Sequence, residues 1–449
     1  MDRTLRRRRF LQGAAALIVG GWAVQGVTGC VRSTVKYVSA EGSDSNPGTQ
    51  AAPWETLVKV RSAMDSGELQ RGSQVLFRRG DTFYGYLHEP TLQGLSGALV
   101  LGAYGSGDRP VISGYKISKA SWIRHTAGVW KLDITAGSGA YTGNTMGAST
   151  NVGFLKVSDT IRGWKRFSLS ELENPWDFYS DETYVYVKRN GNPGANVHIS
   201  VQQDGLRPAP DSHITGLRIE GHGGHGINVG SSQRVSIRDN HVTAIGGSAL
   251  SGTTRYGNGI ECWIGAAEVD IRENTIRETY DVAFTMQGEA SGSSVSWEDI
   301  RFRNNRVENC NQSFEMWSKG TPSPVNGHIR CSFTDNICVD AGYSWAATIR
   351  PDRNGKGTHL LTYSMELPCD VEITRNQFLG ARDHYTRNGD DGLVPPGLDM
   401  HHNIIKLAAG KKIAYLHPET IEQAARWTAR TGKEKGSVAQ RLPATATKE

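Results

Sequence analysis

The chain has 449 residues, with 50 Lys and Arg against 45 Asp and Glu and a formal net charge of +5. Its 37 % hydrophobic content, with 11 Trp and 15 Tyr, is too high for a disordered chain, and six Cys are too few for a disulfide-rich scaffold. Residues 1–30 hold five Arg and one Asp, so residues 31–449 contain 45 basic and 44 acidic residues. The charge therefore gives no indication of nucleic-acid binding by the main part of the chain.

Residues 1–30 have the features of an export signal. Four arginines at positions 6–9 precede Phe10 and an apolar stretch that runs to about Val27. The Arg-Arg-x-Phe-Leu order resembles the twin-arginine signal, and the sequence VTGC at positions 27–30 resembles a lipobox, in which Cys30 becomes lipidated. We therefore expect a periplasmic or cell-surface protein that a lipid on Cys30 attaches to a membrane. An uncleaved anchor, or a signal cut elsewhere, is the alternative.

The remaining cysteines are expected to be buried thiols. Five follow Cys30, an odd number, so at least one is free. Twin-arginine signals direct proteins that have already folded in a reducing compartment, which makes structural disulfides less favoured. A free Cys behaves as a small apolar residue.

The segments before the main repeat predict a helix and a β-rich region. Residues 54–65 have a helical pattern and would cover the open first coil of a solenoid. Residues 115–200 contain a strand-like run at 182–188 but lack the repeat described next, which predicts a β-rich insertion or elaborated coils.

Residues 213–408 repeat the pattern apolar-x-apolar-x-x-Asn-x-apolar. Alternation with period two around a fixed Asn predicts short strands that turn at the Asn, because Asn tolerates the left-handed region and bonds to the backbone. The spacings of 34, 31, 31, 40 and 27 residues fit one solenoid coil for each Asn, with amides bonded along the stack. A propeller blade would need four strands in about 40–45 residues. The repeated residues are Asn240, Asn274, Asn305, Asn336, Asn376 and Asn403.

The chain resembles the pectate-lyase-like superfamily of single-stranded right-handed parallel β-helix proteins. The resemblance is carried by residues 37–49, residues 53–57, the segment 102–114 and the Asn repeats, and it covers most of residues 35–432. It implies an all-β parallel β-helix solenoid. The superfamily includes lyases, hydrolases, epimerases and non-catalytic members, so the resemblance does not define an activity. At the far end, residues 417–432 predict an amphipathic capping helix that stops at Gly432, and residues 433–449 predict a disordered tail.

A second strand is expected after each Asn turn, and its outward side chains are the candidates for the functional face. Residues of one parity should point inward, and long insertions at 246–257, 288–297, 318–327 and 351–368 should form walls around the outer face. The inward set is Ile227, Val229, Ile260, Cys262, Phe284, Met286, Phe314, Met316, Ala347 and Ile349. The outward column is Asn228, Glu261, Thr285, Glu315 and Thr348, with Trp263, Gln287, Trp317 and Arg350 beside it.

This outward face suits a polysaccharide, because aromatic rings stack on sugars while carboxylates and Arg bond to hydroxyls or acids. The slightly favoured hypothesis is hydrolysis of glycosidic bonds. Glu261 and Glu315 lie two coils apart, which can bring their carboxyls into the range of about 6.5–9.5 Å that inverting hydrolysis requires. Asp281 is the third candidate carboxylate, and Tyr280 beside it is a candidate sugar contact.

The alternatives are a lyase and a binding module. β-Elimination on a uronate needs a base, for which Arg350 is the best-placed Arg and Lys319 the only Lys between 213 and 350. The acidic column could then hold Ca²⁺, which prefers oxygen ligands. A non-catalytic glycan-binding lipoprotein would use the same groove. We expect a monomer, and His222 and His225 are expected to be solvated coil residues rather than zinc ligands.

Overall fold

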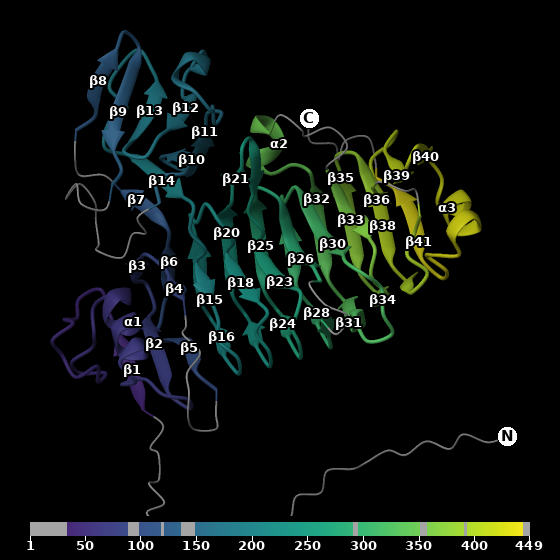
Figure 1. Cartoon of the computed structure of the whole chain (residues 1–449), viewed down its shortest axis with the longest axis horizontal. Coiled ribbons are helices and arrows are strands. Elements are labelled where there is room, and N and C mark those ends of the chain that lie inside the picture. Colours follow the sequence, from purple (N-terminus) through teal and green to yellow (C-terminus); the bar gives the residue numbers. More distant parts are fainter. Residues whose placement is uncertain are drawn as a thin grey trace, which may run out of the picture. The chain divides into compact units, whose positions relative to one another are not determined.

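The computed structural model describes residues 34–88, 98–117, 121–135, 149–290, 295–350, 357–389 and 393–442. The predicted export signal and Cys30 lie outside these residues. Ser33–Glu449 forms one compact unit, in which short strands stack in successive coils (Figure 1). Within the described part of the chain, no helix is long and apolar enough to cross a membrane.

The coils contribute one strand each to three long sheets. Sheet A contains β1 (Val35–Val38), β2 (Gln74–Arg78), β5 (Val100–Tyr104), β16 (His213–Thr215), β19 (Ser236–Arg238), β24 (Asp270–Arg272), β28 (Arg301–Arg303), β31 (Gly327–Thr334), β34 (Cys369–Thr374) and β37 (Leu398–His401), with β27 (Ser296–Glu298) beside β31. Sheet B contains β3 (Thr82–Tyr84), β6 (Val111–Ser113), β17 (Arg218–Glu220), β20 (His241–Ile245), β25 (Thr275–Thr279), β29 (Arg306–Glu308), β32 (Ile337–Ala341), β35 (Gln377–Ala381), β38 (Ile404–Leu407) and β41 (Val438–Arg441). Sheet C contains β4 (Leu87–His88), β15 (Leu206–Arg207), β18 (Ile227–Gly230), β23 (Ile260–Trp263), β26 (Val282–Glu289), β30 (Gln312–Lys319), β33 (Thr358–Met365), β36 (His384–Asn388), β39 (Lys412–Leu416) and β40 (Glu419–Ile421).

Neighbouring strands in these sheets pair in parallel, except that β40 runs antiparallel to β39. The chain passes from sheet A to sheet B to sheet C in each full coil and then begins the next coil. The expected all-β parallel β-helix is therefore confirmed.

The repeated Asn residues form the predicted ladder. The backbone N–H of each Asn donates to Oδ1 of the next at 2.9–3.0 Å, and its Nδ2 donates to the same oxygen at 3.0–3.1 Å. All six side chains are buried. The turn geometry differs from the expectation, because the residue before each Asn, and not the Asn itself, takes the left-handed conformation. These preceding residues are Asp239, Glu273, Asn304, Asp335, Arg375 and His402.

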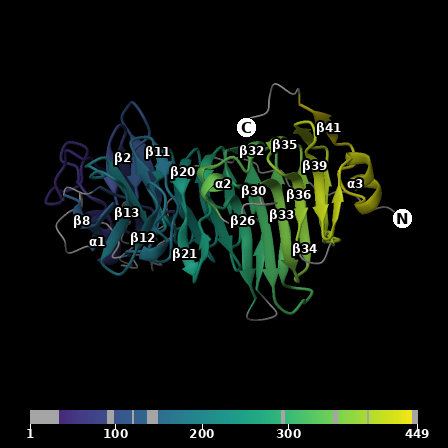
Figure 2. The same ribbon diagram turned by 90° about the horizontal axis from the view of Figure 1, so that it is seen from above.

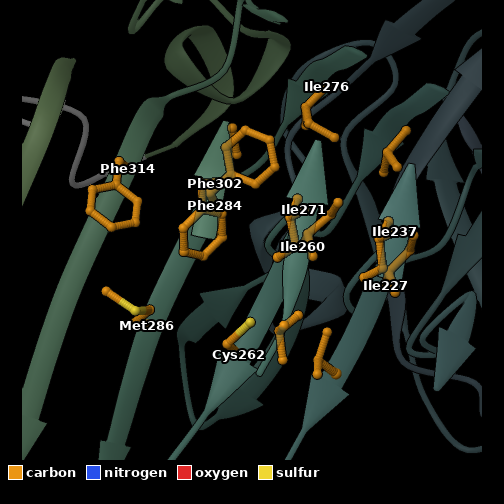
Figure 3. Close-up of a cluster of buried hydrophobic side chains, with 14 of the residues drawn as sticks. Ile227, Ile237, Ile260, Cys262, Ile271, Ile276, Phe284, Met286, Phe302 and Phe314 are labelled. Carbon is orange, nitrogen blue, oxygen red and sulfur yellow. The ribbon is translucent and has the colours of Figure 1, made fainter. Parts of the chain in front are cut away.

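The interior of the coils is a continuous apolar core. Ile260 pairs with Phe284, which pairs with Phe314, so like positions stack from coil to coil. Figure 3 shows these side chains facing those of sheets A and B, such as Ile237 and Ile276. This burial supplies most of the driving force for stacking the coils.

Helices close both ends of the core, as expected (Figure 2). The helix α1 (Leu57–Asp65) begins after Thr56, whose Oγ1 accepts the Lys59 N–H at 3.2 Å. The helix α3 (Ala424–Thr431) is shorter than the predicted 417–432, because Glu419–Ile421 forms β40 and pairs with β39. It buries Trp427 completely and ends at Gly432, which has φ of 72°. Past that point the prediction of a disordered tail is wrong for residues 438–441, because β41 pairs with β38. Residues 443–449 lie outside the described residues.

The insertion predicted at 115–200 forms two antiparallel sheets around its own core. One sheet contains β7 (Tyr115–Ile117), β10 (Val152–Val157), β11 (Thr160–Arg162) and β14 (Val197–Val201). The other contains β8 (Ile123–Thr126), β9 (Val129–Asp133), β12 (Phe178–Ser180) and β13 (Tyr184–Lys188), and a short 3-10 helix spans Leu169–Glu171.

Three inserted segments extend from the coils at the same corner, between a strand of sheet B and the following strand of sheet C. They are the β7–β14 insertion, the hairpin of β21 (Ser248–Ser251) and β22 (Thr254–Tyr256), and the segment containing α2 (Trp345–Ile349). The last corrects a prediction. Residues 346–350 were expected to form an outer-face strand, but they belong to α2 and its end, and the strand of that coil is β33. The side chains of Thr348 and Ile349 lie outside the described residues.

Candidate active site

The outward column of sheet C has the predicted register. Asn228 pairs with Glu261, Glu261 with Thr285, and Thr285 with Glu315. Glu261 and Glu315 are therefore two strands apart, or roughly 9.6 Å between backbones. Both glutamates are deeply buried, at 3 % and 4 % exposure. The column also extends one strand further than the sequence indicated, because Leu206 pairs with Ile227 and this places Arg207 beside Asn228.

Aromatic rings form a row next to this column. Trp263 pairs with Gln287, Gln287 with Trp317, and Trp317 with Tyr363. The ring centroids of Trp263 and Trp317 are 6.1 Å apart, and those of Trp317 and Tyr363 are 6.2 Å apart. Tyr363 replaces Arg350 at the end of the predicted row, because it lies on β33. At the end of β30, Lys319 is exposed, with its Nζ 5.8 Å from the Trp317 ring centroid.

A cleft of about 330 Å³ opens where the column meets the aromatic row. Its lining includes Arg207, Asn228, Glu261 and Trp263. The register shifts within β18, so that Asn228 pairs with Glu261 but Gly230 pairs with Cys262. Gly230 has φ of 58°, which allows the strand to bend away there. On the side of β18 the exposed Trp263 ring thus borders the open cleft, while Trp317 lies on its other side.

A network of charged groups, buried except for Arg207, lies behind the cleft. Asp204 accepts hydrogen bonds from the backbone N–H of His225 at 2.8 Å, the side-chain amide of Asn228 at 3.0 Å and the Arg207 guanidinium at 2.7 Å. His225 Nε2 contacts Glu261 Oε2, a contact that is an ion pair when the ring is protonated, while Glu261 Oε1 accepts the Gln287 amide at 2.9 Å. The carboxylate that faces the cleft thus accepts a hydrogen bond on one oxygen and has the His225 ring against the other.

These neighbours shift the pKa values of two network members. Burial alone would raise the pKa of Asp204, but the charges of His225 and Arg207 and its hydrogen bonds lower it below the usual value. Burial disfavours the charged form of His225, yet Glu261 and Asp204 raise its pKa above the ordinary value. The Asn258 N–H donates to His225 Nδ1 at 3.2 Å, so in the neutral ring the proton sits on Nε2, toward Glu261. The expectation that His222 and His225 are solvated is wrong, since both are buried.

The second carboxylate has its own partner. The Tyr363 hydroxyl donates to Glu315 Oε1 at 3.2 Å. The sequence does not indicate this contact, because Tyr363 lies on β33, within the segment 351–368 that is expected to form an insertion.

Asp281, Arg350 and Tyr280 form a separate cluster. Asp281 lies four residues before Thr285, or about 13 Å along the strand from the column. Arg350 Nη1 donates to Asp281 Oδ1 at 3.0 Å, and its guanidinium lies 4.8 Å from the Tyr280 ring centroid. Tyr280 is only 2 % exposed, so the expectation that it contacts a sugar does not agree with the structure. Arg350 stands at the end of α2 and not in the outward column, which removes the reason for assigning it as a base there.

The acidic column does not fit a Ca²⁺ site in its present arrangement. Glu261 is engaged by His225 and Gln287, and Glu315 by Tyr363. In the described ranges, no group of three or more His, Cys, Asp or Glu side chains lies together as metal ligands would.

The five cysteines of the described chain are unbridged thiols. Four are buried and Cys369 is partly exposed. Burial raises the pKa of Cys310, Cys331 and Cys369 to about 12. These thiols act as apolar packing groups, as expected.

Comparisons with known proteins support the fold. No protein-family model and no curated protein sequence matches the chain. Among solved structures, the chain resembles XylC in complex with xylose, with a TM-score of 0.51, 12 % identity and coverage of 93 % of this chain and 85 % of that chain. A rhamnogalacturonan lyase gives 0.44, 11 % identity and coverage of 93 % and 88 %. A GH136 lacto-N-biosidase from Eubacterium ramulus gives 0.39, 12 % identity and coverage of 91 % and 68 %. At these identities the likeness concerns the fold.

Proposed function

We propose that the protein is a carbohydrate-active enzyme that hydrolyses glycosidic bonds of a polysaccharide in the sheet C cleft. The observation that carries this proposal is the position of Glu261. It is a buried carboxylate at the cleft, next to the exposed Trp263 ring, with a histidine on one oxygen and an amide on the other. A similar fold solved with xylose, that of XylC, agrees with a sugar ligand.

The groups that line the cleft, and those beside it on the outer face of sheet C, each have a chemical role in this proposal. The Trp263 and Trp317 rings stack on sugar rings and set the direction of the glycan along the coils. Glu261 exchanges a proton with the reacting group, and His225 orients its carboxylate and balances its charge. Glu315 is the second carboxylate, and the two-strand separation suits the longer spacing used when water attacks between two carboxyl groups.

A lyase is the second candidate, and one observation favours it. Arg207 is exposed at the cleft beside Asn228, where its guanidinium, which also bonds to Asp204, would lie near the carboxylate of a bound uronate. In that case Glu261 or His225 would accept the proton at the sugar C5 position. A non-catalytic glycan-binding protein would use the same Trp rings, and Glu261 would have no catalytic role.

Product analysis on a glycan panel separates these functions. Wild type, Glu261→Gln, Glu315→Gln and the control Glu289→Gln would be incubated with neutral and acidic polysaccharides. Glu289 is exposed at the end of β26. Hydrolysis adds one water to each cleaved bond, whereas elimination gives an unsaturated product that absorbs in the ultraviolet. We expect water addition in wild type and the control, and a loss of at least about 100-fold in E261Q. Full activity of both E261Q and E315Q would overturn the assignment.

We also propose that Cys30 carries a lipid that holds the exported protein on a membrane. The support is the lipobox-like VTGC sequence after the arginine-rich segment. A Cys30→Ser variant should move from the membrane fraction to the soluble exported fraction, and an unchanged distribution would contradict the proposal.

A further inference from the structure

We propose a second carbohydrate-binding site, specific for neutral sugar units, in a cavity between the β7–β14 insertion and the outer face of sheet B. The cavity has a volume of about 450 Å³, which lies in the range of small-ligand sites. Its lining comes from three separate parts of the chain, namely the insertion, the sheet B strands β17, β20 and β25, and the segment that begins α2. The lining includes Tyr115, Lys156, Arg218, Glu220, Ser344 and Trp345.

Trp345 supplies an aromatic wall that is fixed in place. Its backbone N–H donates to Glu278 Oε2 at 3.1 Å, and its Nε1 donates to the Glu278 carbonyl at 2.9 Å. The ring centroid lies 4.8 Å from that of Phe154 in the insertion and 5.5 Å from that of Tyr280. An immobilised indole at the side of a cavity suits the apolar face of a pyranose, since little side-chain freedom is lost on binding.

Two buried hydroxyls at this cavity lack partners. Tyr115 and Ser344 are each 2 % exposed, and neither the phenol oxygen of Tyr115 nor Oγ of Ser344 has a hydrogen-bond partner within the described structure. Ser344 stands at the N-cap of α2 yet makes no capping bond. A buried hydroxyl without a partner destabilises the folded chain, so two at one cavity point to a ligand that supplies hydrogen bonds. Sugar hydroxyls both donate and accept.

The charges around the cavity select against an acidic ligand. Arg218 pairs with Glu220 at 2.6 Å, and Lys156 lies 3.9 Å from Asp159. Both cations of the lining thus have a carboxylate beside them, and Glu278 adds a further negative charge. A uronate or sulfate would meet more negative than positive groups, whereas a neutral hexose or pentose would not. The proposed ligand is therefore a neutral pyranose unit.

This cavity is distinct from the Glu261 cleft. Its strands belong to sheet B, and the chain turns the corner into sheet C before it reaches Asn228. The two sites share no lining residue. Binding at the cavity does not depend on what the cleft does, so the inference goes beyond the proposed hydrolysis.

Calorimetric titration of the exported chain would test the site. The probes are xylohexaose, cellohexaose and mannohexaose as neutral ligands and hexagalacturonate as the acidic one, each titrated into E261Q so that turnover does not consume them. Tyr115→Phe removes one hydroxyl and keeps the ring. We expect at least one neutral probe to bind, and Y115F to weaken it about three- to tenfold. The matched control is Tyr415→Phe on β39, whose hydroxyl contacts His417.

A second variant and a second readout guard against indirect effects. Ser344→Ala should weaken the same probe by a similar factor, and bound sugar should slow amide hydrogen exchange in β7 and β20. Without sugar, Y115F should melt at the wild-type temperature or higher, because it loses only an unpaired hydroxyl. Unchanged affinity in both variants, preference for the acidic probe, or no binding of any neutral probe would each overturn the inference. If E261Q remains fully active while Y115F still weakens binding, the hydrolase proposal fails and the cavity stands.

Discussion

The rings of Trp263 and Trp317 lie 6.1 Å apart although a whole strand, β26, separates their backbones. The side chain between them is Gln287, which turns its amide toward Glu261. The two indoles can therefore approach each other above it and form a continuous aromatic surface. The amide that permits this approach is also the one that holds the candidate catalytic carboxylate.

Replacing Trp263 with Ala should weaken binding of the substrate glycan about tenfold, since an aromatic contact of about 1.5 kcal/mol corresponds to about that factor. The measurement is the KM or the Kd for the glycan that gives products. Trp164→Ala in the insertion, where Trp164 stacks near Arg166 at 5.5 Å, provides the control. Equal effects of the two substitutions would show that the aromatic row has no special part in binding.

Stability should fall as the pH rises through the titration of His225. Its folded pKa is raised, so its contribution is fully present below the unfolded pKa of about 6.5 and is lost as the pH rises through the folded value. The groups that face the ring are Glu261, Asp204, Arg207 and Tyr256. Urea unfolding of wild type and His225→Asn at pH 5.5 and 8.5 measures the effect.

In H225N the difference between the two pH values should shrink, because the titrating ring is gone. His213→Gln, at an exposed position of β16, should keep the wild-type difference. A pH dependence that is the same in H225N and wild type would contradict the assignment.

Replacing Asn305 with Ala should destabilise the fold by about 3 kcal/mol, since it leaves several buried ladder groups without partners. Asn305 donates through its backbone and side chain to Asn336 and accepts from Asn274. Its neighbour Asn304 provides the contrast. Asn304 has φ of 55°, so Asn304→Gly should be close to neutral in denaturant unfolding. A larger loss at 304 than at 305 would reverse the roles given to these positions.

The thiols of the native protein should resist alkylation at neutral pH. Burial raises the pKa of Cys310 and Cys331 to about 12, so almost no thiolate forms. Mass spectrometry after iodoacetamide treatment should find these residues unmodified in the native state and labelled in urea. Rapid native labelling of either would show that the core opens readily.

The sequence was sufficient for the repeating part of the fold and not for its interruptions. The ladder and the register of Glu261, Thr285 and Glu315 were predictable because each coil repeats a local pattern of period two around an Asn. The strand β33 was missed because the inserted segment containing α2 separates it from its Asn turn, and the apolar run 346–350 imitated the expected strand.

The positions of Arg207 and His225 in the candidate site could not be predicted from the sequence, because the Asn repeat does not determine them. Arg207 joins the column only after the 115–200 insertion, in a coil that carries no Asn repeat. The burial of His225 against Glu261 depends on packing from the neighbouring coil and from Tyr256. A signal was present in the sequence, since Leu206-Arg207 and Ile227-Asn228 share the apolar-polar order of the later strands.

The three inserted segments lie at one corner of the coils, away from the asparagine ladder, which makes them suitable for engineering. The ladder of asparagines runs along the turn between sheets A and B, so none of these segments interrupts it. The hairpin at 248–256 and the α2 segment could therefore be exchanged for loops from another coil protein while the scaffold keeps its stacking interactions. Such grafts would offer a way to alter which glycans the surface accepts without redesigning the scaffold itself.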